Sequence, residues 1–412
     1  MATAIRIKKG LKPMKSQSRR TFLGATAASA GLAGMGLFAA AEEKTIQGFD
    51  ETETTTQKDK VWQPVSDRKV RVGIVGYGVC KFGAAFGFQN HPNVEVAAVS
   101  DLFPDRCAEL AKVCGCEKTY PSLEELVRDD SIEAVFVATD APSHARHCIS
   151  VLEHGKHVAS AVPAVFGSIE DANRLFDTVK SSGLKYMMFE TSAFRNDCYA
   201  MRQVYNAGGF GKMIYTEGEY FHYSATPIDS YKGWRIGCPP QWYPTHANAY
   251  YVCVTGGSFT EVSCRGMVSA QERFQPENNA YKNPHGTEIA LHRTSEGGMA
   301  RMAESRDIPG SHGEVGRVRG QKGSMFGMEY EGLEDISGVT VEKPPLPPGV
   351  PAGGHGGSHG YLCEEFVTAI LEDRDPYVDI VKALNLTVPG IVAHQSAMKD
   401  GELMKIPQFS WG

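Results

Sequence analysis

The stretch that decides the fold is residues 69–101, KVRVGIVGYGVCKFGAAFGFQNHPNVEVAAVSD. It opens with a β-branched, apolar run, which is typical of a buried parallel strand. Gly76, Tyr77 and Gly78 follow directly, where glycine lets the chain turn sharply and lets a diphosphate approach the bare backbone. The pattern then predicts a helix whose positive N-terminal end points at those phosphates, and a second strand that ends in Asp101.

This stretch favours binding of NAD. A carboxylate at Asp101 can accept two hydrogen bonds from a ribose diol and would repel a 2′-phosphate, which favours NAD over NADP. The fingerprint is imperfect, because its third glycine position is occupied by Lys81 and Gly83 comes two residues late. The alternative is an ordinary βαβ unit without a ligand. The strand, the helix and the acid together favour the cofactor.

Composition bounds the remaining possibilities. A chain of 412 residues is long enough for two domains with their own cores. A net charge of −6 does not favour nucleic acid as a partner. The ten cysteines are scattered without a C-x-x-C pair, so we expect mostly buried, reduced thiols.

The N-terminus resembles a twin-arginine export signal. Residues 18–23 (SRRTFL) precede a weakly apolar run rich in Ala and Gly, and small residues at 39–41 offer a cleavage site. The alternative, a membrane anchor, is less favoured because the run holds few Leu, Ile and Val. We therefore expect a signal over 1–41, a polar linker over 42–68, a periplasmic or extracellular location, and no stable membrane anchor after cleavage.

Strands and helices alternate from residue 69 to residue 188, which predicts an α/β fold with a doubly wound parallel sheet. One buried strand ends in the segment 139–144 (TDAPSH), and strand ends in such sheets line the cofactor crevice. His144 begins the next helix, so a capping or solvated histidine is as good an interpretation as a cofactor contact.

Several motifs together resemble the Gfo/Idh/MocA family of NAD(P)-dependent sugar oxidoreductases. They are the G-x-G turn, Asp101, the 139–144 segment and residues 155–158 (GKHV). The resemblance covers about 69–412 and implies a Rossmann domain followed by an open, mainly antiparallel sheet domain. We expect an NAD-binding domain over 69–188, a substrate and oligomerisation domain over 189–345, and C-terminal helices over 346–412 that pack back on the Rossmann domain. An exposed sheet face suggests a homo-oligomer.

The chain departs from the family pattern at its usual catalytic groups. The family carries Glu-Lys-Pro after the GKHV segment, whereas this chain has Ala161, Val162 and Pro163. The family also has an Asp four residues before a His; if that His is His246, its partner position is Trp242. The ordinary dehydrogenase mechanism therefore does not carry over directly.

A narrower resemblance is to NAD-dependent glycoside hydrolases related to bacterial α-N-acetylgalactosaminidases. The matching segments are 162–164 (VPA), 187–190 (MMFE), 217–222 (EGEYFH), 243–246 (YPTH) and 354–357 (GHGG). The resemblance implies the catalytic group Glu190, Tyr220, Arg235, Tyr243 and His246. It implies, with the fingerprint, the cofactor-binding residues Gly76, Tyr77, Gly78, Val79, Asp101, Thr139, His144, Val162 and Pro163.

The predicted second domain begins with a helix capped by Asn196, followed by a strand over 213–223 that alternates with period two. One strand face carries Gly218, Tyr220 and His222, which suits a sugar platform, although a solvated or interface face is the alternative. Further strands are predicted over 258–269, 286–292, 298–304 and 323–331. Helices are predicted over 358–372 and 379–396, the second interrupted or bent at Pro389. His355 and His359 lie among glycines without a third ligand, so we expect no metal there.

Three functions fit these residues. The first is an NAD-dependent oxidoreductase on a sugar or glycoside, in which His246 or Tyr243 accepts the hydroxyl proton as hydride leaves a ring carbon. The second is a glycoside hydrolase that oxidises C3 transiently, eliminates the aglycone and re-reduces the ring. The third is a non-catalytic protein that keeps NAD as a structural element. The retained Tyr, His and Glu group favours the first two.

Overall fold

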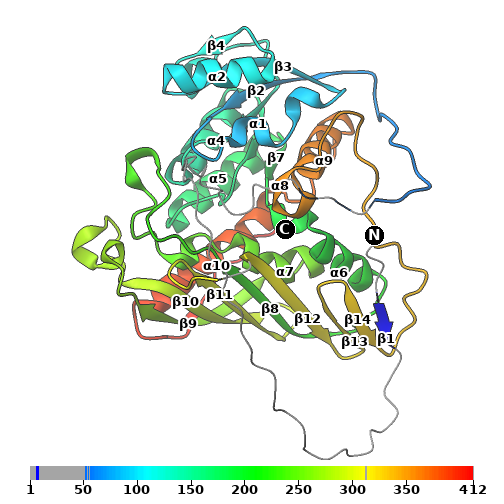
Figure 1. Cartoon of the computed structure of the whole chain (residues 1–412), viewed down its shortest axis with the longest axis vertical. Coiled ribbons are helices and arrows are strands. Elements are labelled where there is room, and N and C mark those ends of the chain that lie inside the picture. The colour runs from blue at the N-terminus through cyan, green and yellow to red at the C-terminus, as the bar shows by residue number, and fades with distance from the viewer. Residues whose placement is uncertain (1–5, 9–51, 53, 55, 311–312, 412) are drawn as a thin grey trace, which may run out of the picture.

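The computed structural model describes residues 6–8, 52, 54, 56–310 and 313–411. The twin-arginine motif, the expected cleavage site and much of the expected linker lie outside these residues. In the described part, two sheets lie at opposite ends of the molecule with helices between and around them (Figure 1). None of the described helices has both the length and the apolar character needed to cross a membrane.

Six parallel strands form the first sheet, in the order β4-β3-β2-β5-β6-β7. Their bounds are β2 (Val70–Val75), β3 (Val94–Ser100), β4 (Thr119–Tyr120), β5 (Ala134–Val137), β6 (His157–Ser160) and β7 (Tyr186–Met188). The chain builds outward from β2 in one direction and then, from β5, in the other. A sheet of this order opens a crevice between the carboxyl ends of β2 and β5, where ligands bind in doubly wound folds.

Helices cover this sheet where the sequence predicts them. They are α1 (Phe82–Ala85), α2 (Pro104–Cys114), α3 (Leu123–Leu126), α4 (His144–Glu153) and α5 (Ile169–Ser182). The hydroxyl of Ser168 accepts a hydrogen bond from the backbone N–H of Asp171 and so caps α5. The helix after the glycine turn is shorter than expected, because Gly87 adopts a φ of 81° and ends it after one turn. It offers little helix dipole to a phosphate.

The second sheet is mixed and mostly antiparallel, in the order β1-β14-β13-β12-β8-β11-β10-β9-β15. Its strands are β1 (Arg6–Lys8), β8 (Met213–Phe221), β9 (Phe259–Val268), β10 (His285–Thr294), β11 (Met299–Ser305), β12 (Gly313–Gly320), β13 (Gly323–Phe326), β14 (Glu329–Gly332) and β15 (Met404–Lys405). The pairs β8–β11 and β1–β14 are parallel. The predicted fold class, a Rossmann domain with a second open sheet, is confirmed.

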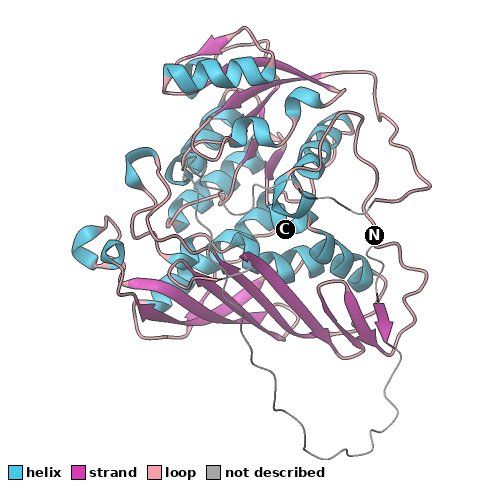
Figure 2. Ribbon diagram, in the orientation of Figure 1, coloured by secondary structure: helices cyan, strands magenta, loops and turns pink. Residues whose placement is uncertain are grey.

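Three helices fill the space between the two sheets: α6 (Asn196–Asn206), α7 (Thr245–Thr255) and α10 (Ile380–Ala397) (Figure 1). Every residue of α7 except its last is buried, because the helix has neighbours on all sides. The described residues place no helix on the opposite face of the sheet, as Figure 2 shows. That outer face carries the half-exposed side chains of Leu291, Met299 and Phe326.

Cross-strand register sets a row of polar side chains on the inner face. Glu288 of β10 is paired with Glu304 of β11, Glu304 with Tyr220 of β8, and Tyr220 with Glu314 of β12. Because side chains at paired positions point to the same face, these four groups lie side by side under the helices. Three of the four are carboxyl groups, and all are buried.

Several element predictions need correction. The predicted strand over 323–331 is a hairpin of β13 and β14, and β12 was not predicted. Arg195, rather than Asn196, is the N-cap of α6. Pro389 lies inside a continuous α10, and Gly390 lets the carbonyl oxygen of Gln241 approach that helix. The two C-terminal helices α8 (Gly354–Gly357) and α9 (His359–Leu371) precede α10.

Candidate active site

A cavity of about 570 Å³ lies over the carboxyl ends of the first sheet and is closed on one side by the 229–235 loop of the second domain. The predicted cofactor residues that line it are Gly76, Gly78, Val79, Asp101, Thr139, His144 and Val162. Tyr77 and Pro163 do not line it and act through hydrogen bonds to neighbours. The cavity therefore occupies the crevice that the topology predicts.

The glycine turn has the shape that a dinucleotide needs. Gly76 has a φ of 104°, and a Cβ there would collide with the carbonyl oxygen of Ala138. A Cβ at Gly83 would stand 2.5 Å from the carbonyl oxygen of Gly76, so Gly83 takes the packing role of the fingerprint's third glycine. A Cβ at Gly78 would meet nothing within 4 Å, so that residue leaves open space at the cavity wall. These positions fit a bound diphosphate.

Asp101 anchors the turn as well as facing the cavity. Its Oδ2 accepts the backbone N–H of Tyr77 at 2.6 Å, and its Oδ1 accepts that of Phe103 at 2.9 Å. Each carboxylate oxygen can accept more than one hydrogen bond, so the group retains capacity for a ribose diol. The predicted contact between Asp101 and the ribose stays a prediction.

His144 joins two loops at the bottom of the cavity. Its Nδ1 lies 2.8 Å from the carbonyl oxygen of Pro163, and its Nε2 lies 3.1 Å from that of Thr139. Burial lowers the pKa of this imidazole despite the two carbonyl groups. A neutral ring has one N–H, so His144 donates to one of these two carbonyl oxygens and packs beside the other, between two segments that line the cavity.

His246 lies at the centre of a buried acid–histidine network in the second domain. Its Nδ1 donates to Oε1 of Glu190 at 2.7 Å, and Oε1 of Glu314 lies 4.0 Å from the same nitrogen. Glu314 is in turn held by the Ser192 hydroxyl at 2.8 Å and by Arg195 at 3.5 Å. Burial lowers the pKa of His246, but the carboxylates of Glu190 and Glu314 outweigh it and raise the pKa above its ordinary value.

This network fixes which nitrogen of His246 is available. Because Nδ1 is held by Glu190, the free position is Nε2, which has no hydrogen-bond partner among the described residues. A small pocket of about 30 Å³ next to the main cavity is lined by His246 together with Tyr220, Arg235 and Tyr243. The network can therefore present a general base or acid to a ligand that spans both cavities.

Two tyrosines flank the imidazole. Their rings are stacked at 6.2 Å, and they lie 4.6 Å (Tyr220) and 5.7 Å (Tyr243) from the ring of His246. Burial raises the pKa of Tyr220 well above its ordinary value and that of Tyr243 to about 12. Both phenols therefore stay protonated at neutral pH, and they can donate hydrogen bonds to a ligand oxygen.

The structure brings all five predicted catalytic residues together. Arg235 packs over the ring of Trp234 at 4.2 Å and lines both the cofactor cavity and the His246 pocket. The part of the β8 face at Gly218 is packed under α7, because a Cβ there would collide with the carbonyl oxygen of Ala247, and the predicted sugar platform stays a prediction. Only Tyr220 and His222 of that face reach the pocket.

Comparison with known proteins places the first domain. Residues 70–190 match the family described as "Oxidoreductase family, NAD-binding Rossmann fold", Gfo/Idh/MocA. Residues 70–190 are thus similar to the NAD-binding domains of that family. The prediction of NAD as the cofactor is confirmed at the level of this domain.

Curated relatives carry a narrower name. The chain is 32% identical over 209 residues to "Glycosyl hydrolase family 109 protein 1" of Bacteroides fragilis, a match that covers 46% of this chain and 44% of that protein. It thus spans less than half the length of that relative. It is 22% identical over 391 residues to the "Glycosyl hydrolase family 109 protein" of Solibacter usitatus, which covers 83% of this chain and 89% of that protein.

Solved structures share the fold across both domains. A levoglucosan dehydrogenase in complex with NADH and levoglucosan superposes with a TM-score of 0.69 at 19% identity, over 83% of this chain and 100% of that chain. A scyllo-inositol dehydrogenase from Lactobacillus casei with bound NAD(H) and scyllo-inositol gives 0.64 at 16% identity, over 82% and 99%. The likeness extends the fold assignment beyond the Gfo/Idh/MocA domain.

The two positions that depart from the family pattern, Val162 and Trp242, hold apolar or aromatic side chains in different places. Val162 lines both the cofactor cavity and the His246 pocket, so an apolar side chain stands between them. Trp242 packs in an aromatic cluster with Phe166 and Tyr281, at ring distances of 5.2 Å each. Trp242 lines neither of those two cavities. The position where the family has its Asp therefore holds a packed indole ring and offers no acid to either cavity.

Sequence reasoning missed Glu314, Arg195 and Arg306. Glu314 belongs to the unpredicted strand β12, and its place beside Tyr220 depends on cross-strand register. Arg306 follows β11 directly, and its guanidinium lies over the rings of Tyr220 at 4.8 Å and Tyr243 at 5.5 Å. No local motif marks Glu314 or Arg306, because both are placed by strand pairing over long sequence distances.

His355 and His359 contact each other and the aromatic wall. Nδ1 of His355 lies 2.9 Å from Nε2 of His359, and the ring of His359 lies 4.4 Å from that of Phe86. Burial lowers the pKa of His355 to about 4 and that of His359 to about 3, so both are neutral. His355 also lines the His246 pocket.

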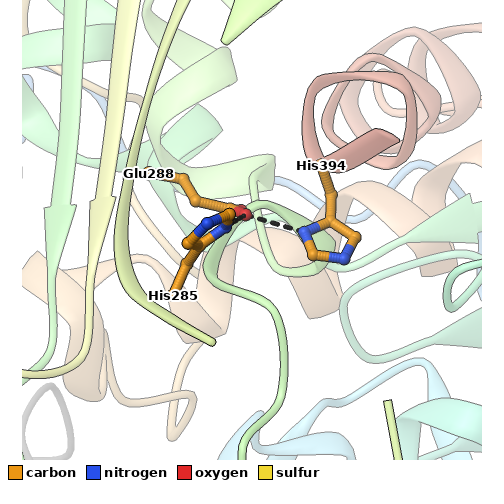
Figure 3. Close-up of side chains that lie close together, drawn as sticks. All are labelled: His285, Glu288 and His394. Atoms are coloured by element: carbon orange, nitrogen blue, oxygen red, sulfur yellow. Dashed lines mark hydrogen bonds and ion pairs between the residues drawn. The ribbon is translucent and has the colours of Figure 1, made fainter. Parts of the chain in front are cut away.

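A second acid–histidine cluster lies between β10 and α10. His285 and His394 both direct Nδ1 at Oε1 of Glu288, at 3.1 and 2.7 Å (Figure 3). These three ligand atoms lie within 4.8 Å of one another and have the chemistry of a zinc ligand set. The other carboxylate oxygen accepts the backbone N–H of Gln241 at 3.0 Å, so the cluster also holds the turn that leads to Tyr243.

Proposed function

We propose that this protein is an NAD-dependent enzyme that transfers hydride at a hydroxyl-bearing carbon of a sugar or glycoside ring. The observation that carries the proposal is the convergence of His246, Tyr220 and Tyr243 on a pocket that adjoins the cofactor cavity, with Glu190 holding the imidazole from behind. A non-catalytic NAD-binding protein would have no use for a buried base held by two carboxylates.

Each residue has a chemical task in this proposal. Bound NAD would supply the hydride acceptor, held along the glycine turn and Asp101. His246 takes the hydroxyl proton at Nε2, and Glu190 stabilises the imidazolium that forms. Tyr220 and Tyr243 donate hydrogen bonds to ring oxygens and orient the sugar. The wall formed by Val162 keeps water away from the junction of the two cavities.

A glycoside hydrolase is the second candidate, and the relatives named glycosyl hydrolase family 109 favour it. A ketone formed at C3 acidifies the proton at C2, a base removes that proton, and the aglycone leaves C1. Water then adds at C1, and reduction restores the ring, so the cofactor is not consumed. The absence of the family's usual Lys and Asp, at Val162 and Trp242, also fits a reaction other than simple dehydrogenation.

The experiment that tests the proposal measures absorbance at 340 nm and nitrophenol release together, with purified protein, NAD and a panel of nitrophenyl glycosides and free sugars. Steady accumulation of NADH supports the oxidoreductase. Release of the aglycone without NADH accumulation supports the hydrolase. Silence in both, with NAD still bound, would contradict the proposal.

Two further features belong to this proposal. The arginine pair Arg19–Arg20 and the small residues at 39–41 support export by the twin-arginine route, which moves proteins already folded around a cofactor. The outer sheet face supports a homo-oligomer, since Leu291, Met299 and Phe326 lie on it half-exposed. Fractionation of a host that carries this pathway, and the mass of the purified protein in solution, test the two features separately.

A further inference from the structure

A second small pocket, of about 50 Å³, continues from the His246 pocket into the second domain. The two share Tyr220, His222, Ile228, Arg235 and Tyr243 in their walls. The deeper pocket is also lined by Arg273 and Arg306, and by no aspartate or glutamate. Three guanidinium groups therefore surround a space just beyond the proposed reacting carbon.

None of the three arginines forms an ion pair with a carboxylate in the part of the chain that the structure describes. Arg306 and Arg235 pack on aromatic faces, over Tyr220 and Trp234 respectively. Arg273 donates to the hydroxyl and carbonyl oxygens of Ser224 and to the carbonyl oxygen of Arg306, and its buried Nε has no partner. Arg195, which also lies on the inner side, has Asp197 and Glu314 within 4 Å.

The nearest acids do not neutralise this charge. Glu304 is buried with no hydrogen-bond partner among the described residues and forms no ion pair with these arginines; burial raises its pKa well above the ordinary value, against the opposing charge of Arg306. Asp307 is held by the hydroxyls of Thr287 and Ser305. Glu190 forms an ion pair with His246, and Glu314 forms one with Arg195.

The electrostatic effect of the arginines extends to their neighbours. Burial and then the charges of Arg306 and Arg235 lower the pKa of His222 to about 4, so this histidine stays neutral. Burial and the charge of Arg306 also lower the pKa of Arg273. Like charges held together out of bulk water are unfavourable unless an anion joins them. Such local conflicts occur in proteins mainly where a ligand resolves them.

We propose that the substrate carries an anionic group, a carboxylate or a sulfate ester, on or next to the ring that reacts, and that Arg306 and Arg273 bind it together with Arg235. This inference rests on the proposed function, because it places the reacting ring in the His246 pocket. Guanidinium groups bind carboxylate and sulfate oxygens through paired, charge-assisted hydrogen bonds. A cavity of about 50 Å³ has room for a few water-sized groups and so suits such an anion better than a second sugar ring.

Binding measurements test the proposal independently of turnover. The full chain with NAD is titrated calorimetrically with D-glucuronate against D-glucose, with D-galacturonate against D-galactose, and with N-acetylglucosamine 6-sulfate against N-acetylglucosamine. We expect the anionic member of at least one pair to bind about tenfold more tightly or better. That preference should shrink as the salt concentration rises. The pair that responds identifies the anion as carboxylate or sulfate.

Variants show whether the arginines cause the preference. R306Q should remove most of the discrimination between the anionic and the neutral sugar, and R306K should retain part of it. R301Q is the matched control, because Arg301 lies on β11, the strand that Arg306 follows, but pairs with Glu217 and Glu219 on the outer face. The melting temperature of R306Q should be unchanged or raised, since the side chain it removes has no acid partner.

Three results would overturn the proposal: equal binding of neutral and anionic sugars, discrimination that survives in R306Q, or binding of inorganic sulfate with no sugar preference, which means an adventitious ion only. Turnover distinguishes this failure from failure of the proposed function. Nitrophenyl glucosides turned over as well as glucuronides would keep the function and reject the anion site. Glucuronate that binds in the presence of NAD with no turnover of any glycoside would reject the function and keep the site.

Discussion

At the scale of single residues, His246 carries the chemistry of the proposed function. Replacing it with alanine should reduce turnover by about 100-fold or more, the contribution typical of a general base. NAD affinity should not change, because His246 lies outside the walls of the cofactor cavity. Steady-state turnover and a fluorescence titration with NAD measure the two effects. A loss of NAD binding in this variant would mean that the imidazole supports the cofactor rather than the substrate.

The carboxylate of Glu190 should set the pH dependence of turnover. It helps to raise the pKa of His246 above the ordinary value of 6.5, so a base at His246 becomes active only as the pH rises through that raised value. E190Q removes the charge and keeps the shape. The acid limb of kcat/KM should then move to lower pH by about one unit, with Glu314 retaining part of the effect. An acid limb that stays in place would assign it to another group.

Asp101 should set the preference between the two nicotinamide dinucleotides. D101A removes the acceptor for a ribose diol and the repulsion of a 2′-phosphate. It also releases the backbone N–H groups of Tyr77 and Phe103, so affinity for both cofactors should fall. The ratio of NAD to NADP affinity is therefore the decisive quantity, and it should fall by about tenfold or more. An unchanged ratio would show that the carboxylate supports only the turn.

The limits of sequence reasoning are clearest among these residues. Glu190, Tyr220, Tyr243 and His246 could be predicted because each lies in a short motif that the chain retains. Glu314 and Arg306 could not, because their positions depend on the pairing of β12 and β11 with β8. The role of the late third glycine could not be predicted either. Only the structure shows that a Cβ at Gly83 would collide with the Gly76 carbonyl oxygen, as expected for the packing glycine of the fingerprint.

At the scale of elements, the cluster of His285, Glu288 and His394 ties α10 to β10 and holds the turn before Tyr243. Burial raises the pKa of Glu288, but the charge of His394 and hydrogen bonds from both histidines and Gln241 outweigh it and lower the pKa to about 2. A carboxyl group with a depressed pKa stabilises the fold above its unfolded pKa near 4.5, and this stabilisation is lost as the pH falls toward 2.

E288Q tests this role of the cluster. Loss of the charge leaves two histidines without their shared anion, and the variant should lose about 3–5 kcal/mol in free energy of unfolding at pH 7. The difference from wild type should narrow as the pH falls from 4.5 toward 2. Urea titrations at several pH values measure both effects. E277Q, which changes an exposed acid in the loop between β9 and β10, is the control. A difference that does not depend on pH would assign the loss to packing rather than to charge.

The elements that sequence reasoning missed share a physical cause. Strand β12 has the sequence GEVGRVRG, which lacks the apolar alternation of a half-buried strand. Its Gly316 is required because a side chain there would collide with the ring of Tyr250 in α7. Close packing of α7 on the sheet thus requires glycine at a position where an apolar side chain would have indicated a strand. The alternating strands and helices of the first domain needed no such compromise, and their order was predictable.

At the scale of the whole molecule, the outer face of the second sheet is the surface that bears on the expected assembly. Leu291, Met299 and Phe326 lie on it at 49%, 40% and 49% exposure, among charged side chains. We expect copies of the chain to associate through this face, because contact would remove the apolar side chains from water.

Light scattering coupled to size exclusion should give a mass at least twice that of one chain for the wild type. L291E should lower that mass, because association would then have to remove a carboxylate from water, opposite Arg301 of β11. L333E is the matched control: Leu333 is 84% exposed and follows β14, the strand next to the edge strand β1, so its replacement should leave the mass unchanged. A wild type that elutes at the mass of one chain would reject association through this face.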